Sequence, residues 1–218
     1  MKSFGTILIS ILCFAFPAQA DTLPKTLFEM AGAKPEPARL SNAVLIIIDA
    51  QREYVDGALP LVGVDAAIAE TAQLLTRARK SGTPVIHIVH KGKGGLFNPD
   101  GHHFEIVAPL QPLTGETVIE KMRVSAFADT KLEEAIQRTG RKNLIIVGFM
   151  THNCVSSTAR AARDLGYVPT IVATATATRD LPDGKGGVIP ASALQAASLA
   201  ELADRTAWVV QKEKEIQE

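Results

Sequence analysis

The sequence predicts an α/β fold, a three-layer α/β/α sandwich built around a parallel sheet. Short, continuous runs of β-branched residues recur along the chain, and longer segments with helical spacing of apolar residues separate them. Strands that are apolar throughout must be covered on both faces, and helices on either side of a parallel sheet do this. We predict strands at 43–48, 84–89, 117–120, 143–148, 168–173 and 207–210, and helices at 65–80, 129–139, 154–165 and 191–203.

The first 20 residues are expected to be a signal peptide, 1–20, and not part of the fold. Lys2 precedes an apolar stretch, and Ala18-Gln19-Ala20 has the small-x-small pattern at which signal peptidase cleaves. The apolar stretch is too short to cross a bilayer as a helix, so no membrane anchor is expected. We therefore expect cleavage after Ala20 and a periplasmic or secreted protein.

About 198 residues follow this leader, which suits a single domain with a sizeable core. Residues 21–42 contain three prolines and are predicted to form an irregular lead-in, with the domain proper at 43–218. The chain has 23 basic and 23 acidic residues, and no basic patch interleaved with aromatic residues occurs. A nucleic-acid partner is therefore not expected.

Cys154 is the single cysteine that remains without the leader, because Cys13 lies inside it. Structural cysteines of exported proteins normally pair, so a lone thiol indicates either chemistry or deep burial. Cys154 follows the strand predicted at 143–148 and stands where a helix pattern begins. The positive end of a helix dipole would lower the thiol pKa from about 8.5 toward neutrality. The alternative is that Cys154 is a small buried hydrophobic residue.

Two further ionisable residues follow predicted strands. Asp49 comes directly after 43–48, and Lys121 after 117–120. The carboxyl ends of parallel strands share one edge of a sheet, and α/β proteins carry their sites there, near the point where the strand order reverses. Taken singly, such an aspartate caps a turn and such a lysine points into solvent. Together with Cys154 they predict a catalytic site.

The segments around these three residues resemble a known family. Ile48-Asp49-Ala50-Gln51, then 121–127, then 148–167 are similar in order and sequence to the isochorismatase-like cysteine hydrolase superfamily, over roughly residues 42–210. The resemblance implies a Rossmann-like fold with a six-stranded parallel sheet and an Asp, Lys and Cys triad.

Carried over to this chain, the triad is Asp49, Lys121 and Cys154. The resemblance also implies a non-proline cis peptide at Phe149-Met150 and an oxyanion hole formed by the backbone N–H groups of Met150 and Cys154. The predicted reaction is hydrolysis of an amide-like C–N bond in a small molecule through a cysteine thioester. Two alternatives stay open: an isochorismatase that cleaves a vinyl ether with Asp49 as proton donor, and a non-catalytic binding protein on the same fold.

No cofactor and no bound metal are expected. His87 and His90 lie on or just after the second predicted strand at an i, i+3 spacing. Residues at this spacing in a strand point to opposite faces, so the two imidazoles cannot easily share an ion.

Four residues near the same edge are candidates for contact with the substrate, and each could instead have a purely structural role. Gln51 either orients Asp49 or caps a turn, and Tyr54 either walls the pocket or packs under a loop. His103 lies in a long connection that either lines the substrate mouth or is merely solvated. Arg179 either recognises a substrate carboxylate or forms a structural ion pair.

The family resemblance also implies a homodimer or larger homo-oligomer. The helix predicted at 191–203 is rich in alanine and serine, which would allow another subunit to approach closely. The same helix could equally pack against its own sheet.

Overall fold

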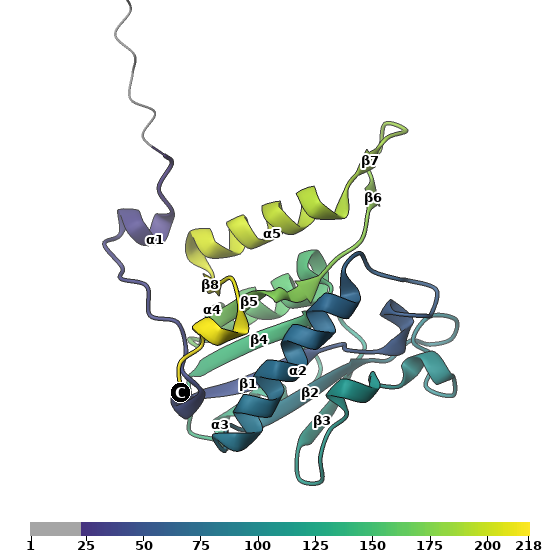
Figure 1. Ribbon diagram of the computed structural model, residues 1–218, viewed down its shortest axis with the longest axis horizontal. Coiled ribbons are helices and arrows are strands. Elements are labelled where there is room, and N and C mark those ends of the chain that lie inside the picture. Colours follow the sequence, from purple (N-terminus) through teal and green to yellow (C-terminus); the bar gives the residue numbers. More distant parts are fainter. Residues whose placement is uncertain (1–22) are drawn as a thin grey trace, which may run out of the picture.

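The computed structural model describes residues 23–218, and in them six strands form one parallel sheet (Figure 1). The strand order is β3-β2-β1-β4-β5-β8, and every neighbouring pair is parallel. The signal peptide predicted at 1–20 lies outside the described residues. The strands are β1 (Ala43–Ile48), β2 (Val85–His90), β3 (Thr117–Lys121), β4 (Asn143–Phe149), β5 (Val168–Ala177) and β8 (Trp208–Val210).

Helices cover both faces of the sheet, which confirms the three-layer α/β/α fold. One face packs against α2 (Val64–Lys80), which crosses the front of the sheet in Figure 1. The other face packs against α3 (Leu132–Gln137), α4 (Ser156–Asp164) and α5 (Ala191–Arg205).

The central strand β1 is buried throughout, because its alternate side chains enter the two separate cores. Leu45 and Ile47 face α2, while Val44, Ile46 and Ile48 face the opposite core, and none of the five is more than 1% exposed. Truncating one such side chain to alanine typically costs about 2–5 kcal/mol of stability. The apolar run that predicted this strand therefore also fixes it at the centre of the sheet.

The strand order reverses between β1 and β4, and Gly148 permits the close contact of these strands. Successive strands β1, β2 and β3 extend the sheet one way, and β4, β5 and β8 extend it the other way. Gly148 has φ +107°, and a Cβ there would lie 2.1 Å from the carbonyl oxygen of Ile48. Only glycine fits such an approach. The ends of β1 and β4 are thus held together at the point where α/β folds place their sites.

The N-terminal lead-in lies across the edge strand β8 and is not wholly irregular. It contains a short helix, α1 (Leu27–Met30), closed at its start by a capping box between Thr26 and Glu29. The ring of Phe28 from α1 stacks on Trp208 of β8 at 4.4 Å. Leu40 donates a backbone hydrogen bond to Gln217, so the C-terminus lies beside the start of β1, at the left in Figure 1.

Two predicted helices begin later than the sequence pattern indicated. Asp129 has φ +58°, a left-handed conformation that cannot start an α-helix, so α3 begins at Leu132. A π-helical turn at Thr151–Val155 precedes α4, so the nucleophile candidate lies in this turn and not in the first turn of an α-helix.

A small hairpin that the sequence pattern did not reveal joins β5 to α5. Its strands, β6 (Leu181–Pro182) and β7 (Val188–Ile189), project from the body of the molecule in Figure 1. Within residues 23–218, no helix has the length and hydropathy needed to cross a bilayer.

Candidate active site

The carboxylate of Asp49 lies at the end of β1 and is fully buried. Its backbone has φ +49°, a left-handed conformation that aspartate tolerates better than most residues, and its N–H donates to the carbonyl of Ile88 at 2.9 Å. This local bend turns the chain out of the strand directly after Ile48. The carboxylate is thereby fixed at the edge where β1 meets β4.

Lys121 reaches the same point from the end of β3, although β2 lies between β3 and β1. Neighbouring strands are about 4.8 Å apart, so a group from β3 must span about 10 Å to meet one from β1. The long lysine side chain covers most of this distance and the Asp49 side chain the rest, and Lys121 is only 1% exposed. Its Nζ lies 2.7 Å from Asp49 Oδ2 and 3.2 Å from Cys154 Sγ.

Cys154 lies in the π-helical turn after β4 and is 4% exposed. The turn is fastened to β5, because the hydroxyl of Thr151 donates to the carbonyl of Ala177 at 3.1 Å. The Phe149–Met150 peptide is cis, as the family resemblance implied. Asp49, Lys121 and Cys154 are thus brought together as predicted, from three different strand ends.

Burial, and not the helix terminus, dominates the ionisation of the thiol. The pKa of Cys154 is raised to about 12, first by burial and second by the charge of Asp49, while Lys121 opposes both. The expectation that a helix dipole would lower this pKa toward neutrality was therefore wrong. The cysteine is a neutral thiol at rest.

Burial also raises the pKa of Asp49, to about 6, against the opposing effect of Lys121. A carboxyl group with a pKa near neutrality can both accept and return a proton, as general acid–base catalysis requires. The three side chains therefore supply a latent nucleophile, a proton carrier and a fixed positive charge in one water-poor site.

Two of the four residues predicted to contact the substrate, Gln51 and Tyr54, are buried and contact other parts of the chain. Gln51 is fully buried, and its amide bonds to the backbone of His90 and Phe104, so it shapes the site through the chain that it holds. Tyr54 is 2% exposed, and its ring packs edge-on against the rings of Phe97 and Phe149. Burial, and next Asp49, raise the pKa of the Tyr54 hydroxyl, so this side chain lies close to the charges of the site.

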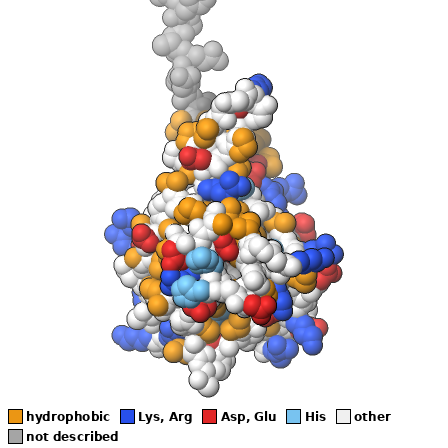
Figure 2. Space-filling model, turned by 90° about the vertical axis from the view of Figure 1, so that its right-hand side faces the viewer, with side chains coloured by type: hydrophobic (Ala, Val, Ile, Leu, Met, Phe, Trp, Pro, Cys, Tyr) orange, Lys and Arg blue, Asp and Glu red, His pale blue; other side chains and the backbone are white. Residues whose placement is uncertain are grey.

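The other two candidates lie nearer the surface. Arg179 is half-buried, its Nε has no hydrogen-bond partner among the described residues, and its charge acts on Tyr54 and His152. His103 is exposed in a short turn, His102–Phe104. Figure 2 views the molecule from the side on which the strands end, and histidine side chains gather near the middle of that surface.

Two histidines at the site were missed as functional candidates. His90 ends β2, and its Nδ1 lies 3.0 Å from Lys121 Nζ. His152 lies in the nucleophile turn, and its ring nitrogen contacts the hydroxyl of Thr178. His90 could have been found from the sequence, because it ends a strand at the same edge as Asp49 and Lys121.

The other histidine of β2 has a different partner, as the i, i+3 spacing predicted. His87 Nε2 lies 2.9 Å from Glu116 Oε2, and Arg79 holds the same carboxylate at 2.8 and 2.9 Å. Across residues 23–218, no three His, Cys, Asp or Glu side chains are grouped so that they could hold a metal ion.

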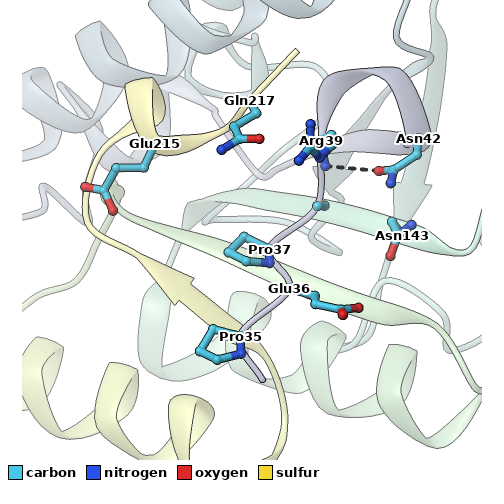
Figure 3. Close-up of a pocket in the computed structure, with 9 residues that line it drawn as sticks. Pro35, Glu36, Pro37, Arg39, Asn42, Asn143, Glu215 and Gln217 are labelled. Carbon is cyan, nitrogen blue, oxygen red and sulfur yellow. Dashed lines mark hydrogen bonds between the residues drawn. The ribbon is translucent and has the colours of Figure 1, made fainter. Parts of the chain in front are cut away.

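A cavity of about 420 Å³ lies at the opposite edge of the sheet (Figure 3). The lead-in, the start of β4 and the C-terminal tail enclose it, and Arg39 donates a backbone hydrogen bond to Asn42 beside it. Its side chains have no contact with the triad, because β4 runs from this cavity to the nucleophile turn. The lining residues are Pro35, Glu36, Pro37, Ala38, Arg39, Asn42, Asn143, Glu215 and Gln217.

Comparison with known proteins shows the family to which this chain belongs. The family model described as the isochorismatase domain matches residues 43–214. The secreted isochorismatase effector Isc1 of Verticillium dahliae is 36% identical over 177 residues, which are 80% of this chain and 90% of that protein. A ureidoacrylate amidohydrolase of Variovorax paradoxus is 28% identical and covers 73% of this chain and 79% of its own length.

A solved structure shares both sequence and fold. The crystal structure of an isochorismatase from Pseudomonas putida is 48% identical, with a TM-score of 0.85, and the match covers 89% of this chain and all of that one. The family match spans most of the chain and includes Asp49, Lys121 and Cys154. The chain belongs to the isochorismatase family of hydrolases.

Proposed function

We propose that this protein is an exported cysteine hydrolase that cleaves an amide-like C–N bond of a small molecule with Asp49, Lys121 and Cys154 as its triad. The observation that carries the proposal is the contact of Lys121 Nζ with both the Asp49 carboxylate and the Cys154 sulfur, in a buried site. The relative from Variovorax paradoxus is named for amide hydrolysis, which supports this choice of bond.

In the proposed reaction, the thiol transfers its proton to Asp49 as the sulfur attacks the substrate carbonyl carbon. The two events occur together, because the free thiolate is strongly disfavoured in this site. Lys121 and the backbone N–H groups of Met150 and Cys154 would stabilise the negative charge that develops. Asp49 then gives its proton to the leaving nitrogen, and the C–N bond breaks. Water, deprotonated by Asp49, hydrolyses the thioester and restores the thiol.

Arg179 is the residue that we propose for recognition of a carboxylate on the substrate. It lies close enough to the site to act on Tyr54 and His152, and no acidic side chain among residues 23–218 forms an ion pair with it. A hydrogen bond to a charged group is worth about 1.5–3 kcal/mol. Arg179→Met should therefore raise KM roughly 10- to 100-fold for an acidic amide and leave KM for its uncharged analogue unchanged. Equal KM values for the acidic amide in both proteins would exclude this role.

A second candidate is vinyl ether cleavage of the isochorismatase type. The relative from Verticillium dahliae and the structure from Pseudomonas putida are both named as isochorismatases, which favours it. In that reaction Asp49 would protonate the substrate, and no bond to Cys154 would form.

Intact-mass spectrometry under turnover separates the two reactions. The substrates would be isochorismate and a panel of small amides and carbamoyl compounds, each with wild type, Cys154→Ser and Asp49→Asn. We expect an acyl adduct on the wild-type chain, and loss of turnover in both variants. Turnover of isochorismate that survives Cys154→Ser, with no adduct on wild type, would instead establish the vinyl ether reaction.

The proposed export rests on the sequence of the leader and on a relative that is named as secreted. Mass spectrometry of the protein recovered from the periplasm or medium should give a chain that begins at Asp21. Recovery of the full-length chain from the cytoplasm alone would contradict the proposal.

A further inference from the structure

We propose that His90 is a positioning residue, whose neutral imidazole accepts a hydrogen bond from Lys121 and so holds the lysine between Asp49 and Cys154. His90 is the last residue of β2, the strand that Lys121 must cross to reach the other two side chains. Its Nδ1 lies 3.0 Å from Lys121 Nζ. The inference rests on the proposed hydrolase function, since Lys121 has a catalytic role only there.

The acceptors around Lys121 show what the imidazole of His90 contributes. An ammonium group has three N–H donors and no acceptor. Four acceptors surround it: Asp49 Oδ2 at 2.7 Å, His90 Nδ1 at 3.0 Å, and the Cys154 sulfur and the Arg123 carbonyl, both at 3.2 Å. Unlike Asp49, His90 is uncharged, so it orients the ammonium without adding a negative charge that would weaken the attraction of Lys121 for the sulfur.

The contact requires one protonation state of His90. Lys121 can only donate, so Nδ1 must be unprotonated and the ring proton must be on Nε2. Burial and the charge of Lys121 lower the pKa of His90 to about 4. Lys121 is the charged group that acts on the ring, and the side chains of Gln51 and Phe97 that pack around His90 are uncharged. The imidazole therefore stays a neutral acceptor across the neutral pH range.

Neighbouring residues hold both the backbone and the ring of His90. Gln51 clasps the backbone of His90, since its Oε1 accepts from the His90 N–H at 2.7 Å and its Nε2 donates to the His90 carbonyl at 3.0 Å. The ring of Phe97 packs edge-on against the imidazole at 5.0 Å. Phe97 is fixed in turn by Glu53, whose carboxylate accepts from the Phe97 N–H at 3.0 Å. Gln51 therefore fixes the strand end that carries His90, and Phe97 packs against one side of the ring.

Three variants separate this role from a general structural one. His90→Asn places Oδ1 at the same distance along the side chain as Nδ1, so it keeps an acceptor that does not titrate. His90→Leu fills a similar volume and removes the acceptor. His87→Asn is the matched control, because His87 lies on the same strand, faces Glu116, and has no contact with the triad.

The readout is the rate of Cys154 alkylation by iodoacetamide between pH 6 and 10, which requires no substrate. Lys121 lowers the pKa of Cys154, so a displaced ammonium should slow alkylation and move its pH profile to higher pH. We expect His90→Leu to react roughly tenfold more slowly at pH 8, while His90→Asn and His87→Asn keep the wild-type profile. Wild-type rates for His90→Leu, or equal slowing in His90→Asn, would overturn the proposal.

Nitrogen NMR of histidine-labelled wild-type protein tests the same idea without any variant, in case His90→Leu does not fold. We expect an unprotonated Nδ1 in His90 at pH 7, and a protonated Nδ1 would refute the proposal. Neither measurement depends on hydrolysis. A protein that shows these results yet forms no acyl adduct would contradict the proposed function and leave the role of His90 intact.

Discussion

Replacing Asp49 with asparagine should abolish turnover and yet make the Cys154 thiol more reactive. Both side chains contact Lys121 Nζ, at 2.7 and 3.2 Å, so the carboxylate and the sulfur are at most about 6 Å apart. Two unit charges at about 6 Å in an effective dielectric of about 20 repel each other by about 3 kcal/mol, which is about two pKa units. The carboxylate therefore contributes substantially to the raised pKa of Cys154.

The expected change in rate is smaller than the change in thiolate population. Removing the negative charge should raise the thiolate fraction at neutral pH about 100-fold. The nucleophilicity of a thiolate falls as its pKa falls, with a Brønsted coefficient of about 0.4–0.5, so each thiolate should react about tenfold more slowly. Alkylation of Cys154 by iodoacetamide at pH 7.5 should thus be roughly tenfold faster in Asp49→Asn than in wild type.

The assay compares alkylation rates of wild type, Asp49→Asn and Asp65→Asn by mass spectrometry. Asp65 is exposed on α2, so its variant controls for the loss of one surface carboxylate and should react like wild type. Slower alkylation of Asp49→Asn, with the fold intact by circular dichroism, would refute the reasoning. It would show that Asp49 already accepts the thiol proton in the free enzyme.

Three further predictions concern stability and assembly. Burial raises the pKa of Asp49 from 3.8 to about 6, so this group binds more protons in the folded state than in the unfolded state, and its contribution to stability should fall by about 3 kcal/mol as pH rises from about 4 to about 7. The lowered pKa of His90 acts in the opposite direction over the same range, so the measurement is the difference in urea-unfolding free energy between wild type and Asp49→Asn at each pH, which should fall by that amount. In the same urea-unfolding assay, Gly148→Ala should lower the free energy of unfolding by more than about 4 kcal/mol or prevent folding, because its Cβ would collide with the Ile48 carbonyl. The control Gly82→Ala has open space around its Cβ and φ +66°, so it should lower the free energy of unfolding by only about 1–2 kcal/mol through backbone strain. Light scattering of residues 21–218 at micromolar concentration should give the mass of a dimer or larger assembly, and a monomer mass would contradict the proposed homo-oligomer.

The sequence by itself determined the layers of the fold and the edge that carries the site. The uninterrupted apolar run of β1 requires cover on both faces, and a polar residue that directly follows such a run must lie at the edge of the sheet. Asp49 and Cys154 follow strands and Lys121 ends one, so local patterns alone predicted that the three lie at one edge. The family resemblance then implied their roles and the cis peptide.

Only the tertiary structure decided how these residues interact. The pKa of Cys154 depends on how much protein covers it, and burial outweighs the effect expected from a nearby helix terminus. The contact between His90 and Lys121 exists because β2 lies between β3 and β1, and the clasp of Gln51 on His90 joins residues 39 positions apart. Such features depend on strand order and on contacts between distant segments. Local residue patterns carry no direct record of either, because they reflect the burial and backbone preferences of neighbours in the chain.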